Sequence, residues 1–211
     1  MTVARLRAWI ALALLLVSTA APAQITAKGE YTRLSPPRPV ATGSRIEVIE
    51  FFYYGCPICY ELQPLMSRWL VGAPNYVAHR RVPVSSADGW ESFARLFYTL
   101  EIMGQIPRLH WPVYDNFHFD NVQLNQEKVM QDWVARNGLD RDKFTEVYNS
   151  AEVKAKIDES RELIKNYDVR GVPTIAVDGK YVTSARLAGG TRQLMLLVDD
   201  LVKQARKERP N

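Results

Sequence analysis

Residues 46–62 read IEVIEFFYYGCPICYEL. The first nine of them, Ile46 to Tyr54, form an almost continuous run of apolar, β-branched and aromatic residues, which is typical of a central strand covered on both faces. Beyond the cysteines, apolar residues recur at helical spacing. We therefore predict a buried strand that leads directly into a helix. Cys56 and Cys59, the only two cysteines of the 211-residue chain, lie at the junction.

The position of the cysteine pair predicts that one sulfur is ionised. If the helix begins at the motif, Cys56 takes the N-cap position and Pro57 the first helical position, where its missing N–H is not needed. The Cys56 sulfur then faces unpaired N–H groups and the positive end of the helix dipole. Ile58 offers neither charge nor donor, so the backbone alone stabilises the thiolate. We expect Cys56 to be the nucleophile in disulfide exchange and Cys59 to resolve the mixed disulfide.

Other interpretations of the cysteine pair are weaker. A structural disulfide would close a very short loop and would constrain the unfolded chain little. Zinc prefers four nitrogen or sulfur ligands, and none of the three histidines, His79, His110 and His118, stands at ligand spacing to the motif, so we expect no metal site. An inert buried pair stays open as an alternative, because aromatic residues flank the strand end.

The N-terminal residues predict export. Arg5 and Arg7 precede an apolar run at 8–17, and small residues follow as far as Ala23. This pattern is typical of a cleavable secretory signal, here residues 1–23. A membrane anchor is the alternative, but a bilayer crossing needs about 20 apolar residues. Removal of the signal lowers 27 basic residues to 25 against 23 acidic ones, a balance that indicates no nucleic-acid partner.

The rest of the chain predicts the order β-α-β, a helical block, then β-β-α. Within the block, Asp88 and Glu91 resemble a capping box, and Asp140 and Ser150 precede two further helices. An Asp178-Gly179 turn indicates a β-hairpin near the C-terminus. The chain length allows one domain with an insertion. Besides the central strand, strands are predicted at 31–34, 76–84, 174–177 and 180–183.

Three features lie in a known order: the CPIC motif with its flanks, the helical block, and Gly171-Val172-Pro173-Thr174. Together they resemble the periplasmic DsbA-type thiol:disulfide oxidoreductases over roughly residues 24–206. That family has an α/β fold, a thioredoxin domain interrupted by a helical insertion. The resemblance implies a first thioredoxin part at 24–86, an all-helical insertion at 87–167 and a second thioredoxin part at 168–211.

The resemblance also implies roles outside the motif. Val172 and Pro173 resemble the cis-proline segment whose backbone pairs with an extended substrate peptide, although an ordinary trans proline entering a strand is an alternative. Glu50 resembles a buried acid that assists proton transfer at the inner cysteine. We expect desolvation to raise its pKa. A core ion pair with His79 or Arg81 is the alternative interpretation of Glu50.

As a whole, the resemblance implies a periplasmic enzyme that introduces disulfide bonds into reduced exported proteins. A quinone-linked DsbB-type membrane protein is the implied reoxidant, a monomer is expected, and no cofactor is needed because the two sulfurs carry the electrons. Ile58 departs from the best-known members, which have histidine there, so the oxidising strength stays open. The alternatives are a reductase or isomerase on the same fold, and a non-redox peptide-binding holdase that uses an aromatic surface at Tyr53, Tyr54 and Tyr60.

Overall fold

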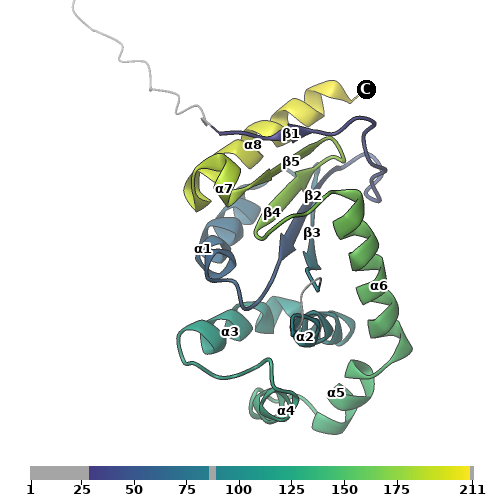
Figure 1. The fold of residues 1–211 in the computed structure, drawn as a ribbon, viewed down its shortest axis with the longest axis vertical. Coiled ribbons are helices and arrows are strands. Elements are labelled where there is room, and N and C mark those ends of the chain that lie inside the picture. The colour runs from purple at the N-terminus through teal and green to yellow at the C-terminus, as the bar shows by residue number, and fades with distance from the viewer. Residues whose placement is uncertain (1–28, 86–88, 210–211) are drawn as a thin grey trace, which may run out of the picture.

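A five-stranded mixed sheet forms the centre of the molecule (Figure 1). The computed structural model describes residues 29–85 and 89–209, so the predicted export signal lies outside the described residues. The strand order is β1-β5-β4-β2-β3, in which β2 and β3 are parallel and the other pairs antiparallel. The strands are β1 (Thr32–Arg33), β2 (Ile46–Phe52), β3 (Val77–Pro83), β4 (Thr174–Val177) and β5 (Tyr181–Ser184).

Helices connect the strands in the predicted order. In the part of the chain that the structure describes, one helix joins β2 to β3, five lie between β3 and β4, and two follow β5. Within the described residues no helix is long and apolar enough to span a membrane. The helices are α1 (Pro57–Gly72), α2 (Glu91–Ile102), α3 (Ile106–His118), α4 (Glu127–Arg136), α5 (Arg141–Tyr148), α6 (Ala151–Asn166), α7 (Ala185–Ala188) and α8 (Thr191–Glu208).

Strand β2 is buried along its whole length because both of its faces are covered. Successive side chains of a strand point to opposite faces. Ile46 and Val48 accordingly pack in the cluster formed by α1 and α8, whereas Ile49 and Phe51 pack against the C-terminal part of α6. The continuous apolar run that predicted a central strand thus serves two separate cores.

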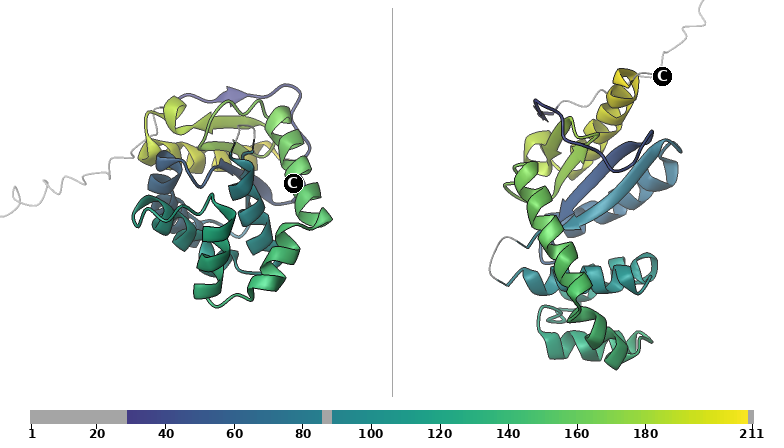
Figure 2. Two further views of the ribbon diagram at one scale, coloured as in Figure 1. Left: turned by 60° about the horizontal axis from the view of Figure 1, so that its bottom comes forward. Right: turned by 90° about the vertical axis from the view of Figure 1, so that its right-hand side faces the viewer.

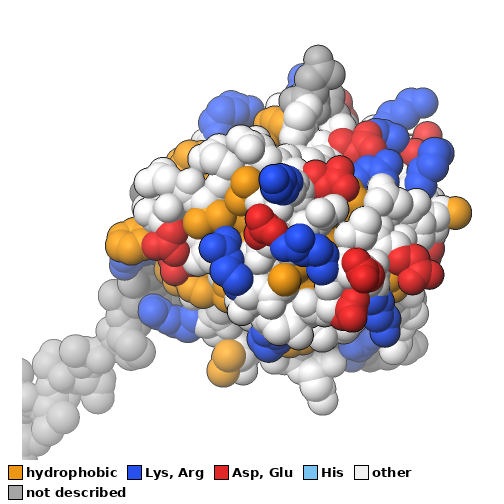
Figure 3. All heavy atoms as spheres, turned by 90° about the horizontal axis from the view of Figure 1, so that it is seen from below, with side chains coloured by type: hydrophobic (Ala, Val, Ile, Leu, Met, Phe, Trp, Pro, Cys, Tyr) orange, Lys and Arg blue, Asp and Glu red, His pale blue; other side chains and the backbone are white. Residues whose placement is uncertain are grey.

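The helical block forms a layer of its own at one end of the sheet, and α6 leads back from it (Figure 2). Its apolar core joins the end of β2 through Phe52, and it includes Tyr54 and Cys59. On the face of the block seen from below, Lys and Arg side chains are mixed with Asp and Glu, without a field of one sign (Figure 3).

Local signals in the block are confirmed in part. The Asp140 and Ser150 side chains cap α5 and α6 by accepting hydrogen bonds from Lys143 N–H and Val153 N–H. Asp88, the first residue of the expected capping box, lies outside the described residues; α2 begins at Glu91, and its N-cap residue Trp90 makes no side-chain hydrogen bond. The short helix α7 was not foreseen, since its four residues are too few to show a periodic pattern.

The hairpin turn between β4 and β5 depends on its glycine. Gly179 has φ +66°, and a Cβ there would lie 2.1 Å from the Arg38 carbonyl oxygen. We predict that Gly179→Ala destabilises the fold by about 1–3 kcal/mol, measured by urea denaturation. Gly72 is the matched control: it ends α1 with no atom near its Cβ position, so Gly72→Ala should be neutral or stabilise by up to about 1 kcal/mol. Equal effects at both positions would contradict this account of the turn.

Candidate active site

Cys56 occupies the N-cap position of α1, as the sequence predicts. Its backbone is extended (φ −87°, ψ 118°), and its sulfur accepts a hydrogen bond from the Cys59 N–H at 3.4 Å. Pro57 is the first residue of the helix. A hydrogen bond from the Cys56 N–H to the Tyr53 carbonyl, at 3.0 Å, closes the turn between β2 and α1. The N–H groups of the first helical turn are therefore directed at one sulfur.

The two thiols have opposite pKa shifts. The pKa of Cys56 is lowered from 9.0 to about 6, because hydrogen bonds from the Cys59 thiol and from the N–H groups of Cys59 and Ile58 outweigh partial burial. Cys59 has no exposed surface, and burial together with the adjacent Cys56 raises its pKa well above 9.0. At neutral pH the pair therefore consists of a reactive thiolate and a shielded thiol.

The segment at Val172-Pro173 lies beside this sulfur although it is far away in the sequence. The Cys56 thiol lies 3.6 Å from the Val172 carbonyl oxygen, and the Val172-Pro173 peptide bond is cis. The alternative of an ordinary trans proline is therefore wrong. The fold thus brings three of the predicted site residues, Cys56, Val172 and Pro173, to one end of the sheet.

Glu50 corrects one expectation. It is completely buried, and burial alone raises its pKa, but the neighbouring His79, Arg81 and His110 outweigh that effect and lower the pKa to about 2. Glu50 pairs with Arg81 across the β2–β3 register, and Arg81 Nε lies 3.2 Å from its carboxylate. His79 Nε2 lies 3.5 Å from the same oxygen, without hydrogen-bond geometry. The expected raised pKa is wrong because the alternative, a core ion pair, is what the structure contains.

A buried hydrogen-bond chain extends from Glu50 into the helical block. Gln63 Nε2 donates to the Glu50 carboxylate at 2.5 Å, His110 Nε2 lies 3.2 Å from Gln63 Oε1, and Tyr54 OH lies 2.8 Å from His110 Nδ1. The carboxylate only accepts, so Gln63 donates to it, His110 donates to Gln63, and Tyr54 donates to His110. This direction requires neutral His110, whose pKa burial lowers to about 3.

The sequence analysis missed Gln63 and His110. Each showed a weak signal, because each is a polar residue on the apolar face of its helix: Gln63 beside Leu62 and Met66, and His110 beside Leu109. Only the tertiary contact between α1 and α3 brings these two residues into one hydrogen-bond chain. The chain they complete connects the sheet, the cysteine helix and the helical block.

The aromatic residues around the motif are not one exposed surface. Tyr54 has no exposed area. Tyr53 stacks on Trp90 with ring centroids 4.0 Å apart, and a Cβ at Gly55 would lie 2.5 Å from the Tyr53 ring, so Gly55 leaves room for that ring. Tyr60 stacks on the ring of Trp111 in α3. Tyr54 therefore does not contribute to the exposed aromatic surface that a holdase would use.

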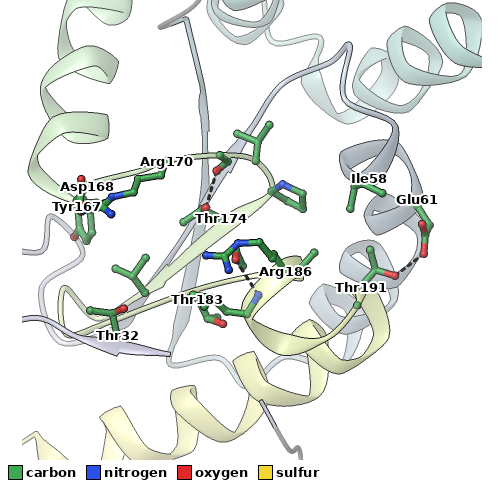
Figure 4. A pocket seen from close by; sticks show the side chains of 18 of the residues that line it. Thr32, Ile58, Glu61, Tyr167, Asp168, Arg170, Thr174, Thr183, Arg186 and Thr191 are labelled. Carbon is green, nitrogen blue, oxygen red and sulfur yellow. Dashed lines mark hydrogen bonds and ion pairs between the residues drawn. The ribbon is translucent and has the colours of Figure 1, made fainter. Parts of the chain in front are cut away.

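A cavity of about 820 Å³ opens beside the motif (Figure 4). Ile58 of α1 lies on one side, and Val172 and Pro173 border it from the loop before β4. The remaining wall comes from β1, the segment 167–171, the start of β4, β5, α7 and the start of α8. Within residues 29–85 and 89–209, no group of three His, Cys, Asp or Glu side chains could hold a metal ion. A volume of about 820 Å³ lies within the range of known ligand-binding cavities.

Comparison with known proteins identifies the family. Residues 75–201 match the model of the DSBA-like thioredoxin domain. The chain belongs to the DsbA family. It is 36% identical over 185 residues to the thiol:disulfide interchange protein DsbA of Azotobacter vinelandii, covering 88% of this chain and 86% of that protein. It is 36% identical over 201 residues to the DsbA of Pseudomonas aeruginosa strain PAO1, covering 95% of each chain.

Solved structures of DsbA proteins share the fold. The crystal structure of Pseudomonas aeruginosa DsbA has a TM-score of 0.80 at 36% identity, covering 85% of this chain and 93% of that one. The oxidoreductase NmDsbA1 of Neisseria meningitidis has a TM-score of 0.71 at 26% identity, covering 88% and 96%. The predicted α/β class, a thioredoxin fold with inserted helices, is confirmed. This DsbA-family chain is a protein thiol:disulfide oxidoreductase.

The lowered pKa of Cys56 predicts how its reactivity depends on pH. The alkylation rate of the reduced protein by iodoacetamide should rise with pH through a midpoint near pH 6 and then level off, since only the thiolate reacts. Cys59→Ala removes the thiol that donates to the Cys56 sulfur and should move the midpoint to higher pH. Cys56→Ala, which leaves only the buried thiol, should show no such rise in the alkylation rate. A midpoint near 9.0 in the wild type would refute the account.

The lowered pKa of Glu50 predicts a loss of stability in acid. Its folded-state pKa lies below the ordinary 4.5, so its contribution is complete above about pH 4.5 and is lost as the pH falls towards 2. The loss corresponds to about 3 kcal/mol. Urea denaturation at several pH values should show it in the wild type and in the exposed control Glu146→Gln, but not in Glu50→Gln. An identical acid profile for all three proteins would show that Glu50 is not held as an anion.

Proposed function

We propose that the enzyme oxidises pairs of thiols in client proteins through the Cys56-Cys59 disulfide. A client thiolate attacks the Cys56 sulfur, which breaks the Cys56-Cys59 bond, forms a mixed disulfide and releases Cys59, which takes up a proton. A second client thiolate then attacks the client sulfur of the mixed disulfide and releases Cys56 as a thiolate. The client leaves with a disulfide, and the enzyme retains two electrons as a dithiol.

The ionised sulfur of Cys56 is the observation that carries this proposal. A thiolate with a pKa near 6 is a good leaving group in the second step, so the mixed disulfide resolves rapidly towards the oxidised client. At pH 7 this ionisation favours the reduced enzyme by at most about 1.4 kcal/mol, or about 30 mV, and by less because Cys56 is partly exposed. Both effects favour oxidation of the client.

We propose a positional role for Glu50 in place of the expected proton relay. A carboxyl group with a pKa near 2 is a poor acceptor for the Cys59 proton at neutral pH. Its contacts with Arg81 and Gln63 instead anchor α1 to the sheet at the level of the motif. Val172 and Pro173 are proposed to receive the client backbone in extended form, since they lie beside the reactive sulfur and border the cavity.

We propose that the enzyme acts as a monomer in the periplasm on reduced exported proteins and is reoxidised by a quinone-linked membrane protein of the DsbB type. The export signal expected at residues 1–23, the DsbA relatives and the wide cavity support this assignment. We propose that the helical insertion comprises residues 87–167. The start of α2 at Glu91 and the end of α6 at Asn166 fall within them.

A reductase or isomerase on the same fold is the second candidate, and Ile58 is the observation that favours it. It has no charge or side-chain donor, and it is 43% exposed at the motif, so only its N–H assists the thiolate. A less stabilised Cys56 thiolate would make the Cys56-Cys59 disulfide less oxidising. The choice between the two directions is therefore one of reduction potential.

The test is oxidation of a reduced secretory protein whose activity requires its disulfides. The oxidised enzyme should restore that activity, and Cys56→Ala should abolish the effect. Equilibration with glutathione buffers then gives the potential, which we expect well above that of periplasmic isomerases. A potential near that of cytosolic reductants would support the reductase. Suppression of client aggregation that survives in Cys56→Ala would support the holdase.

A further inference from the structure

The cavity beside the motif has a wall whose polar groups are mostly bonded to each other. The Thr174 hydroxyl donates to the Gly171 carbonyl at 2.7 Å, and the Thr191 hydroxyl donates to the Glu61 carboxylate at 2.6 Å. Asp168 is paired with Arg170, whose guanidinium nitrogens lie 2.6 Å and 2.9 Å from one carboxylate oxygen. These groups have hydrogen-bond partners, and the Asp168-Arg170 pair is also neutralised. Glu61 keeps its charge, because its partner is a neutral hydroxyl, and it lies with Thr191 at the α1 side of the cavity, away from Arg186 (Figure 4).

Among the charged side chains of this wall, Arg186 is the cation that lacks a partner in the described residues. It lies on α7, is exposed, and makes no hydrogen bond or ion pair with any residue of 29–85 or 89–209. Its side chain extends from α7 into the cavity (Figure 4). A guanidinium is always charged and presents a fork of donors that matches a carboxylate. As far as the described residues show, the guanidinium of Arg186 therefore stands in the cavity without a counter-ion.

Apolar groups lie opposite this cation. Ile58, Val172 and Pro173 form the side of the cavity next to the reactive sulfur. A client segment bound there would bury apolar side chains against these residues while its backbone passes Arg186. The combination of an apolar floor and one free guanidinium fits an acidic peptide segment better than a neutral or basic one.

We propose that Arg186 is a specificity residue that favours clients with a carboxylate side chain within about three residues of the cysteine that reacts with Cys56. The range of three residues follows from the scale of the cavity, because a cube of 820 Å³ has an edge of about 9 Å and three extended residues span about 10 Å. This inference rests on the proposed exchange reaction, and it names the client chemistry that this reaction selects.

The experiment compares oxidation rates of short synthetic peptides with one cysteine pair. One series has Glu at a single position up to three residues before or after the first cysteine, a second has Gln there, and a third has Lys. We expect the wild type to oxidise the best Glu peptide about two- to fivefold faster than its Gln partner, the range for an exposed ion pair. The preference should shrink as salt is added, because screening weakens an exposed pair.

Variants assign the effect to one side chain. In Arg186→Gln the Glu-to-Gln rate ratio should fall to about one, and in Arg186→Glu it should invert in favour of Lys. Arg136→Gln on α4, far from the cavity in the fold, is the matched control and should keep the wild-type ratio. Thermal unfolding of each variant verifies that it is folded, and the salt series of the wild type needs no variant at all.

The contrary outcomes are distinct. Equal rates for Glu and Gln peptides in the wild type, or a preference that survives Arg186→Gln, would overturn the inference while the exchange reaction stands. A preference for Lys peptides would assign selection to Glu61 instead. Failure to oxidise any of the three series would overturn the proposed function, and the inference with it.

Discussion

The hydrogen bond from the Cys59 N–H to the Cys56 sulfur joins the fold to its chemistry. It exists because a buried strand ends and a helix begins within a few residues, so that the helix N-terminus has a sulfur at its cap. An N-terminus in this position stabilises negative charge without any cationic side chain. The rest of the molecule holds β2 and α1 in that relation, through the two cores on either face of the sheet.

The hydrogen-bond chain beneath the motif stabilises the buried charge of Glu50. A buried carboxylate is costly unless it is paired and hydrogen-bonded, and Glu50 has both Arg81 and Gln63. The chain then continues to His110 on α3, so the charge in the sheet is linked to the helical block. Because every donor in the chain has one acceptor in a fixed direction, the block is held at a defined position above the cysteines.

Recognition and chemistry share residues at this site. Val172 lies beside the Cys56 sulfur and also borders the cavity, while Ile58 belongs both to the motif and to the cavity wall. Under the proposed exchange reaction, a client bound in the cavity is presented to the sulfur by the backbone of Val172, which also binds it. Main-chain pairing tolerates many sequences, so discrimination between clients falls to side chains at the edge of the cavity. We propose Arg186 for that task because no carboxylate of residues 29–85 or 89–209 pairs with it.

The sequence by itself determined the features that depend on near neighbours. Cys56 at the helix cap, Pro57 at the first position, the caps at Asp140 and Ser150, and the Asp178-Gly179 turn all follow from residues within a few positions of each other. Only the tertiary structure decided the state of Glu50, because its pKa depends on Arg81 and His110, which burial brings within reach across 31 and 60 positions of the chain. The cavity with Arg186 is equally a product of the fold, since five separate segments must meet to enclose it. Local propensity acts along the chain, whereas desolvation and charge act through space, and the latter are not fixed until the chain is packed.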